Sequence, residues 1–329
     1  MANHFRMQID MHVHIVGNGA GGTGCWLRVR GWRRPFATLM VRHIGLSISA
    51  MSGDLDQLYV QRLLEQVRGS SLGAAVILAQ DEVRDAQGSV MEGVGSFYVP
   101  NDYVLKLARE HPEFMPAVSI HPARPDALEE LDRCLAAGAV MMKCLPNCQN
   151  IDCGDRRYMK FWERMAEAKL PLLAHTGGEH TLPVLRPDFA DPRILTRPLE
   201  CGVTVIAAHC GTRSGLIDPE YFHVFAEMTR RFPHFYGDSS AFNVPFRGRH
   251  IAACLEEPLA SRLVHGSDYP VPVHGHWAWM RGFVNWREFR RAEAHSNILE
   301  RDYRLKLAMG FPPEHFTRIA GLLRRPAAK

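Results

Sequence analysis

The sequence predicts an α/β fold: a (β/α)8 TIM barrel with a long first βα loop, formed as a single domain by residues 1–329. Three observations support this prediction. Eight apolar runs read as strands, helical patterns lie between them, and the strands recur about every 30 residues, as is typical of this fold. The chain is 329 residues long and 46% hydrophobic, so it can bury a core of that size.

The eight predicted strands begin near the amino terminus and alternate with helices. Several are apolar on both faces, as parallel strands covered by helices should be. They span residues 8–14, 73–82, 114–121, 139–145, 170–176, 203–210, 235–241 and 262–268. Helical patterns cover residues 101–111, 127–137, 156–169 and 221–232, and Pro or Gly marks several of the joins.

The first connection, residues 15–54, is too long for a plain βα loop and is rich in Gly, Arg and Trp. Its segment 17–22 fits the G-x-G-x-x-G pattern after a strand, but residues 23–28 do not begin a helix, so we reject a dinucleotide site. The glycines favour a loop that folds over the barrel mouth and excludes water. A flexible loop without such a role is the alternative.

Five of the predicted strands end in a side chain that can bind a divalent metal. His12 and His14 lie two residues apart on the first strand, so their side chains face the same way. Later strands end in Lys143, His175, His209 and Asp268. The carboxyl ends of the strands meet at one face of a (β/α)8 barrel, so we expect all these side chains to converge into one site.

Imidazole and carboxylate ligands favour zinc, with manganese and iron(II) as alternatives. A metal held there would lower the pKa of its bound water from 15.7 to about 7 and so supply hydroxide for attack on an electrophilic carbon. Asp268 could take the proton of that water and pass it to the leaving group.

Five motifs carry the candidate metal-site residues: Asp10-Met11-His12-Val13-His14, Met142-Lys143-Cys144-Leu145-Pro146, Leu173-Ala174-His175-Thr176-Gly177, Ala208-His209-Cys210-Gly211 and His265-Gly266-Ser267-Asp268-Tyr269-Pro270. This ordered set resembles the amidohydrolase superfamily, in particular the amidohydrolase 2 branch of metal-dependent TIM-barrel hydrolases, over the whole chain. The resemblance implies that His12, His14, His175 and Asp268 bind metal, and that His209 is a further ligand or an acid/base. Ala320-Gly321-Leu322-Leu323 replaces the Gly-Asn-Ala segment usual in the family.

The resemblance leaves two interpretations of Lys143. In two-metal relatives the equivalent lysine is carboxylated by CO2 and bridges the ions. In one-metal members the lysine pairs with a carboxylate or a substrate anion. The sequence therefore predicts one or two divalent ions, with Lys143 as a carboxylated ligand in the two-ion case.

Further residues are candidates for substrate contact. His121 ends the third strand, and Arg213 and Arg247 follow the sixth and seventh strands, where they could grip a carboxylate. Each has a structural or solvated alternative. Asp238 is expected to orient a ligand histidine. Trp26, Trp32, Phe36, Trp277 and Trp279 indicate an apolar lining, loop anchors or subunit contacts.

These observations favour a metal-dependent hydrolase that cleaves an amide, lactone or ester of a small, anionic substrate. The alternative is a metal-dependent decarboxylase or hydratase of a small aromatic or unsaturated acid, and the third is a barrel that only binds a metabolite. Lys143 favours the hydrolase, because a bridging lysine suits water activation.

The composition limits the partners and the compartment. A formal charge of +4 spread over the chain is no nucleic-acid footprint. The sequence lacks a run of about 18 apolar residues, so no membrane span is expected. Residues 1–6 lack the apolar stretch of a secretory signal, and the eight cysteines lack paired disulfide spacing, which predicts a cytoplasmic protein. A homodimer is expected from the resemblance.

Overall fold

The computed structural model describes residues 7–325. Residues 1–6, on which the prediction about a secretory signal rests, lie outside this range. Eight parallel strands form one sheet in the order β1-β3-β5-β6-β7-β8-β9-β10. They are β1 (Ile9–His14), β3 (Ala74–Leu78), β5 (Phe114–Val118), β6 (Met141–Cys144), β7 (Leu172–His175), β8 (Val205–Ala208), β9 (Phe235–Asp238) and β10 (Leu263–Val264). A parallel bridge between Val13 and Tyr269 joins the end of β1 to the segment after β10, so the barrel is nearly closed.

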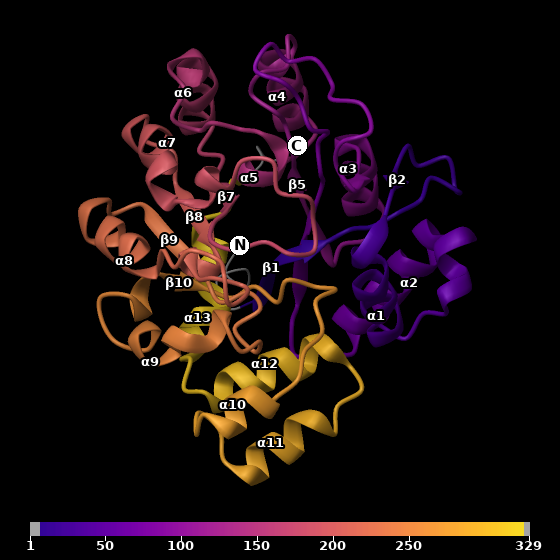
Figure 1. Ribbon diagram of the computed structural model, residues 1–329, viewed down its shortest axis with the longest axis vertical. Coiled ribbons are helices and arrows are strands. Elements are labelled where there is room, and N and C mark those ends of the chain that lie inside the picture. Colours follow the sequence, from indigo (N-terminus) through magenta and orange to yellow (C-terminus); the bar gives the residue numbers. More distant parts are fainter. Residues whose placement is uncertain (1–6, 326–329) are drawn as a thin grey trace.

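Thirteen α-helices lie among the described residues, and Figure 1 shows them around the strands. They are α1 (Arg34–His43), α2 (Leu55–Arg68), α3 (Asn101–Glu110), α4 (Ala127–Ala136), α5 (Pro146–Gln149), α6 (Met159–Glu167), α7 (Thr196–Glu200), α8 (Phe222–Arg231), α9 (Ile251–Cys254), α10 (His276–Met280), α11 (Trp286–Glu293), α12 (Ile298–Ala308) and α13 (Pro313–Thr317). The predicted (β/α)8 barrel is confirmed: each predicted strand overlaps an observed one, and the four predicted helices correspond to α3, α4, α6 and α8.

Helix α2 illustrates why these segments cover the barrel. Its buried residues Leu55, Tyr59, Leu63 and Val67 recur every four positions and so form one apolar face. That face packs into a core shared with the outward side chains of the strands. The opposite face of the helix remains in solvent.

The interior of the barrel is filled by alternate strand residues. Ile9, Met141 and Leu173 belong to one inner cluster, which Ile319 and Leu323 join from the carboxyl-terminal segment. Arg324 donates its backbone N–H to Val140 O at 3.0 Å, just before β6 begins. The carboxyl-terminal segment therefore closes the end of the barrel opposite to the strand carboxyl ends, which leaves the other end for chemistry.

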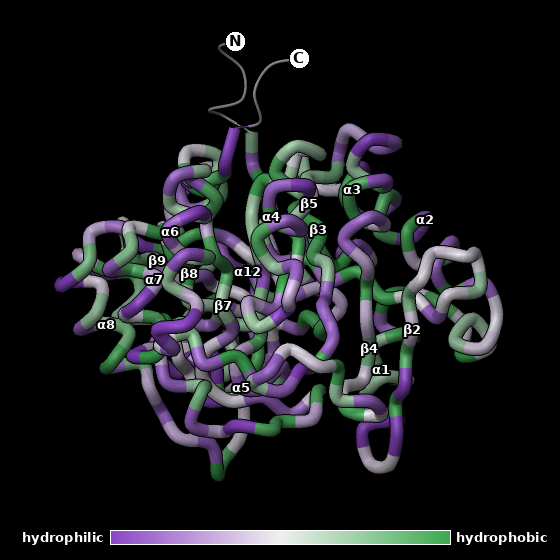
Figure 2. Tube along the Cα trace, turned by 90° about the horizontal axis from the view of Figure 1, so that it is seen from above, coloured by the Kyte–Doolittle hydropathy of each residue, from purple (hydrophilic) through white to green (hydrophobic). Residues whose placement is uncertain are grey.

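The long first connection has structure of its own. The expected absence of a helix after residues 17–22 is confirmed, because strand β2 (Trp26–Leu27) follows and pairs antiparallel with β4 (Phe97–Tyr98). Helix α1 comes next, and Figure 2 places β2, β4 and α1 on one side of the barrel. Among residues 7–325, no helix is both long and apolar enough to cross a membrane.

Candidate functional site

A β-bulge in the first strand turns both of its histidines inward. Asp10 pairs with Ala75 and Val13 with Ile77, so β1 uses one more residue than β3 over the same length. Such an extra residue reverses the in–out alternation. Met11 faces the inner core, and His12 then points inward as well. The Nε2 atoms of His12 and His14 lie 3.2 Å apart, which confirms that the two rings face one site.

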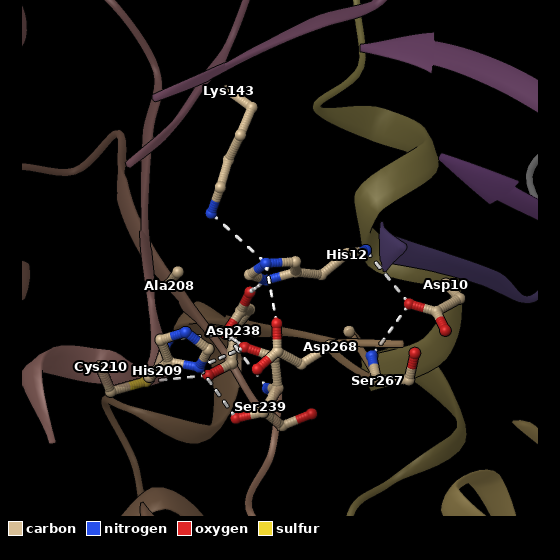
Figure 3. A network of polar contacts seen from close by, with 12 residues as sticks. Asp10, His12, Lys143, Ala208, His209, Cys210, Asp238, Ser239, Ser267 and Asp268 are labelled. Carbon is tan, nitrogen blue, oxygen red and sulfur yellow. Dashed lines mark hydrogen bonds and ion pairs between the residues drawn. The ribbon is translucent and has the colours of Figure 1, made fainter. Parts of the chain in front are cut away.

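Two more strands deliver polar residues by simple alternation. Met141 and Leu173 point into the barrel, so Lys143 and His175, two positions further on, point inward at its carboxyl end. Lys143 Nζ lies 3.3 Å from His12 Nε2. Figure 3 marks this contact with a dashed line. The ring centroid of His175 lies 5.0 Å from that of His209.

His209 directly follows strand β8, and Asp268 lies in the turn after β10, beyond His265, Gly266 and Ser267. Both have left-handed backbone conformations, with φ of 60° and 67°. Non-glycine residues rarely adopt such angles, and the residues that do so cluster at functional sites. Asp268 Oδ1 lies 3.3 Å from His12 Nε2 and 3.4 Å from His14 Nε2. Gly266 permits this approach, because a Cβ there would lie 2.7 Å from the Cβ of His12.

The buried Asp238 at the end of β9 fixes two of the histidines. Its Oδ2 lies 2.7 Å from His12 Nδ1, and its Oδ1 accepts the backbone N–H of His209 at 2.8 Å. Ser240 Oγ lies 2.8 Å from His209 Nδ1 and also contacts Asp238. His12 therefore presents Nε2 to the site, and so does His209, because each Nδ1 already has a partner. Asp238 has the orienting position expected of it.

The environment keeps these imidazoles neutral. Burial, helped by the nearby Lys143 charge, lowers the pKa of His12 to about 4. Burial also lowers the pKa of His175 to about 3 and that of His209 well below its usual range. Although burial alone would raise the pKa of Asp268, the adjacent His12 and His14 hold it well below its usual range. Neutral imidazole and ionised carboxylate are the forms that bind metals.

The donor atoms suit a divalent ion. Ligand atoms of His12, His209 and Asp268 all lie within 4.8 Å of one another. His14 adjoins this group through His12 and Asp268, and His175 adjoins it through His209. Burial lowers the pKa of Lys143, so its amine is more readily uncharged and less repulsive to a cation than an exposed lysine. All six predicted metal-site residues are thus brought together.

A cavity of about 660 Å³ opens onto these groups. His14, His175, His209 and Asp268 lie in its wall, together with Arg247 from the segment after β9. Arg247 is buried and donates hydrogen bonds to Gly178 O at 2.8 Å and Thr212 O at 3.2 Å. Trp32 and Phe36, two of the aromatic residues expected to line a pocket, also face the cavity.

The structure does not bring the other two substrate-contact candidates to the cavity. His121 is fully buried; its Nε2 lies 3.0 Å from Gln149 O and its Nδ1 accepts the Ala123 N–H. Both ring nitrogens are thus used by the backbone. Arg213 lies over the Phe246 ring with its Nε 3.9 Å from Glu220. Neither His121 nor Arg213 lies in the cavity wall, and substrate contact by these two residues stays a prediction.

Three residues in or around the site were not singled out from the sequence as contributors to it. Ser240 holds His209, and Glu179 Oε2 lies 3.8 Å from His175 Nε2. Asp10 Oδ1 accepts the N–H groups of His12 and Ser267 and so ties β1 to the turn that carries Asp268. Asp10 lay within a motif quoted from the sequence, and Ser240 lies two residues after Asp238.

Comparison with known proteins decides the family. A family model described as Amidohydrolase matches residues 9–296. The chain belongs to the amidohydrolase 2 family. Members of this family are enzymes and typically bind a divalent metal, and the cluster of His12, His209 and Asp268 accords with that property.

Solved structures share the barrel of this amidohydrolase. An uncharacterised TIM-barrel protein from Bordetella bronchiseptica is 17% identical with a TM-score of 0.58, over 92% of this chain and 99% of that one. A provisionally assigned 2-pyrone-4,6-dicarboxylic acid hydrolase from Pseudomonas putida (16%, TM-score 0.55) and a 2,6-dihydroxybenzoate decarboxylase (14%, TM-score 0.55) each match over 96% of this chain and 98% of theirs. At these identities the likeness shows the fold alone. No curated protein matches the chain.

Substituting Asp238 tests its orienting role. Asp238→Asn is expected to weaken metal affinity about 10–100-fold, because the amide no longer fixes His12 as a carboxylate does. Competition with a chromophoric chelator measures the affinity. Asp132→Asn, at an exposed ion pair with Arg164 on the outer surface, is the matched control. Equal affinities for the two variants would contradict this role.

Proposed function

We propose that this amidohydrolase is a metal-dependent hydrolase that cleaves an amide, lactone or ester of a small anionic substrate. The observation that carries the proposal is the joint placement of six metal-competent side chains at the carboxyl end of the barrel, beside a cavity. A single buried histidine is commonly structural. A set of imidazoles and an ionised carboxylate that converge beside one cavity has the chemistry of a metal centre.

His12, His14, His175 and Asp268 would hold the ion, with His209 as a further ligand or as an acid/base beside it. Zinc suits this donor set best, and manganese and iron(II) are the alternatives. Such an ion acts as a Lewis acid and makes water a nucleophile at neutral pH. Asp268 lies in the cavity wall as an ionised carboxylate, and it would accept a proton there and return it to the leaving group.

Lys143 supports the hydrolase in preference to the lyase. Its buried amine, with a lowered pKa and Nζ 3.3 Å from His12 Nε2, is suited to react with CO2 and become a carboxylated ligand. A carboxylated Lys143 would add a negative oxygen donor for a second ion. A bare ammonium at this distance would instead repel one.

Arg247 supports an anionic substrate. Its buried guanidinium lies in the cavity wall and uses donors on the carbonyls of Gly178 and Thr212, which fixes its position. The cavity is of a size that suits a small molecule. Dimer formation remains a prediction.

A decarboxylase or hydratase of a small aromatic or unsaturated acid is the second candidate. The largely apolar lining of the cavity favours it, because a carboxylate removed from water there loses hydration. Asp268 or His209 would then protonate carbon. The site residues are the same in both cases, so the reaction must be decided by assay.

Metal removal tests the proposal. A chelator is expected to abolish turnover, and zinc or manganese is expected to restore it. Elemental analysis of protein purified without chelators should give about two metals per chain if Lys143 is carboxylated. About one would favour the four-ligand centre and raise the lyase to equal rank. No bound metal, even after reloading, would overturn the metal centre.

Substrate screening then separates the two reactions. Lactones, esters and amides are expected to be hydrolysed by the metal-loaded protein. Release of CO2 from hydroxybenzoates without turnover of those substrates would favour the decarboxylase instead.

A further inference from the structure

The cavity is larger than the metal site requires. One water takes up roughly 30 Å³ of liquid, and we assign the same volume to each non-hydrogen atom of a ligand. A carboxylate with a single ring would then occupy less than half of the 660 Å³ cavity. The remaining space would hold waters against a mainly apolar wall. Such waters are readily displaced by an apolar group of matching size.

The polar and apolar parts of the wall come from different segments. The histidines, Asp268 and Arg247 stand at the barrel mouth. The first connection contributes an apolar wall that includes Trp32, Phe36, Met40, Val41, Ile44 and Met51. Most of these belong to or adjoin α1, so the apolar part of the cavity lies under that helix.

Helix α1 and the residues just before it carry apolar side chains that line the cavity but are also partly exposed to solvent. Trp32, Phe36 and Leu39 are 56%, 48% and 54% exposed. Exposed apolar residues that gather along one short segment commonly mark a binding site. A ligand in the cavity would cover the parts of these side chains that face inward.

The charged groups of the cavity specify the polar end of the ligand. Asp268 and Glu179 bring two negative charges, and Arg33 and Arg247 bring two positive ones. A divalent ion in the site would leave the cavity positive. Arg33 Nε is also buried without a hydrogen-bond partner among the described residues, and so remains available to an acceptor.

We propose that the cavity binds an elongated amphiphile: a carboxylate whose uncharged apolar body, larger than one ring, lies under α1. This inference rests on the proposed function for its polar end, which would face the metal centre and Arg247. The body would pack against the apolar side chains that residues 32–51 place in the cavity wall. Residues of the first connection, rather than the barrel strands, would therefore set the substrate size.

Calorimetric titration of the metal-loaded protein with straight-chain carboxylates from hexanoate to dodecanoate tests this inference. Each added methylene is expected to tighten binding about fourfold, from about 0.8 kcal/mol per buried CH2, until the apolar space is filled. Saturation at one molecule per chain is expected. Binding that does not tighten with chain length, or that does not saturate, would overturn the proposal.

A charge placed in the apolar wall provides the matched comparison. Met40→Asp is expected to weaken decanoate binding at least tenfold and to leave hexanoate binding nearly unchanged. Met159→Asp makes the same substitution at an exposed site on α6 and should behave as the unmodified protein. Equal decanoate affinities for the two variants would refute a ligand under α1. A second result would also refute the proposal: the protein binds no carboxylate but self-associates, and Met40→Asp abolishes that self-association. In that case α1 would be a subunit interface.

The two proposals can fail separately. A protein that binds long carboxylates but hydrolyses no lactone, ester or amide would retain the size inference and lose the hydrolase. A protein that hydrolyses short substrates without any length dependence in binding would retain the hydrolase and lose the size inference.

Discussion

Asp268→Asn is expected to lower kcat by about 10²–10⁴-fold, the usual contribution of a positioned acid/base group. Asp268 lies in the cavity wall, and its Oδ1 is within 3.4 Å of both His12 and His14. The asparagine keeps the size of the side chain and one oxygen donor. The amide cannot accept a proton, so kcat should fall strongly while the thermal midpoint stays close to that of the unmodified protein.

Three measurements separate this role from a structural one. The rate is measured on the substrate found in the lactone, ester and amide screen, metal content by elemental analysis, and fold by circular dichroism and thermal midpoint. Asp126→Asn removes a carboxylate at a surface ion pair with Arg124 and should leave the rate unchanged. An unchanged kcat for Asp268→Asn with metal bound would show that Asp268 is not the proton carrier.

Lys306→Met is expected to lower the free energy of unfolding by about 3–5 kcal/mol, the usual cost of leaving a buried charge unpaired. Lys306 on α12 is fully buried. It donates to Asp302 Oδ2 at 2.5 Å and to Gly266 O at 2.7 Å. Methionine fills most of the space but leaves Asp302 and the carbonyl without this partner.

Urea denaturation measures this loss as a lower midpoint. Lys106→Met removes an exposed lysine that pairs with Glu110 in α3, and should change stability by less than about 1 kcal/mol. The double variant Lys306→Met/Asp302→Leu should regain much of the loss, because no charge is then left buried. A midpoint for Lys306→Met equal to that of Lys106→Met would rule out a structural role for the buried pair.

Both substitutions bear on the same turn. The segment from His265 to Asp268 is held by Lys306 at Gly266 O and by Asp10 at the N–H of Ser267. The left-handed backbone of Asp268 thus depends on contacts from α12 and β1. Lys306→Met is therefore expected to reduce turnover as well as stability.

The sequence by itself determined the barrel and the convergence of the metal-site residues. Strand and helix patterns are local, so the apolar runs and the helical periods can be read without knowing what they pack against. The position of a polar residue at a strand end is also local. Because parallel strands of a barrel share one carboxyl face, His12, His175 and Asp268 could be placed together although they are far apart in the chain.

Only the tertiary structure decided how each side chain is used. The bulge that turns His12 inward is defined by the partner strand β3 and has no mark in β1 alone. His121 ends a predicted strand as His175 does, but in the structure its Nε2 contacts the carbonyl of Gln149 in another segment. Arg213 and Arg247 both follow strands, yet only Arg247 lies in the cavity wall.

The cavity is formed by segments far apart in the sequence, so only the tertiary structure decided its position and its lining. Its apolar wall under α1 comes from residues 32–51, and the metal-competent groups come from β1 and from strands later in the chain. Trp32 and Phe36 indicated an apolar lining, but loop anchors and subunit contacts remained alternatives, because the pattern within a loop does not say which distant groups it faces. Strand periodicity fixes direction locally, whereas a loop's position depends on contacts between residues far apart in the sequence.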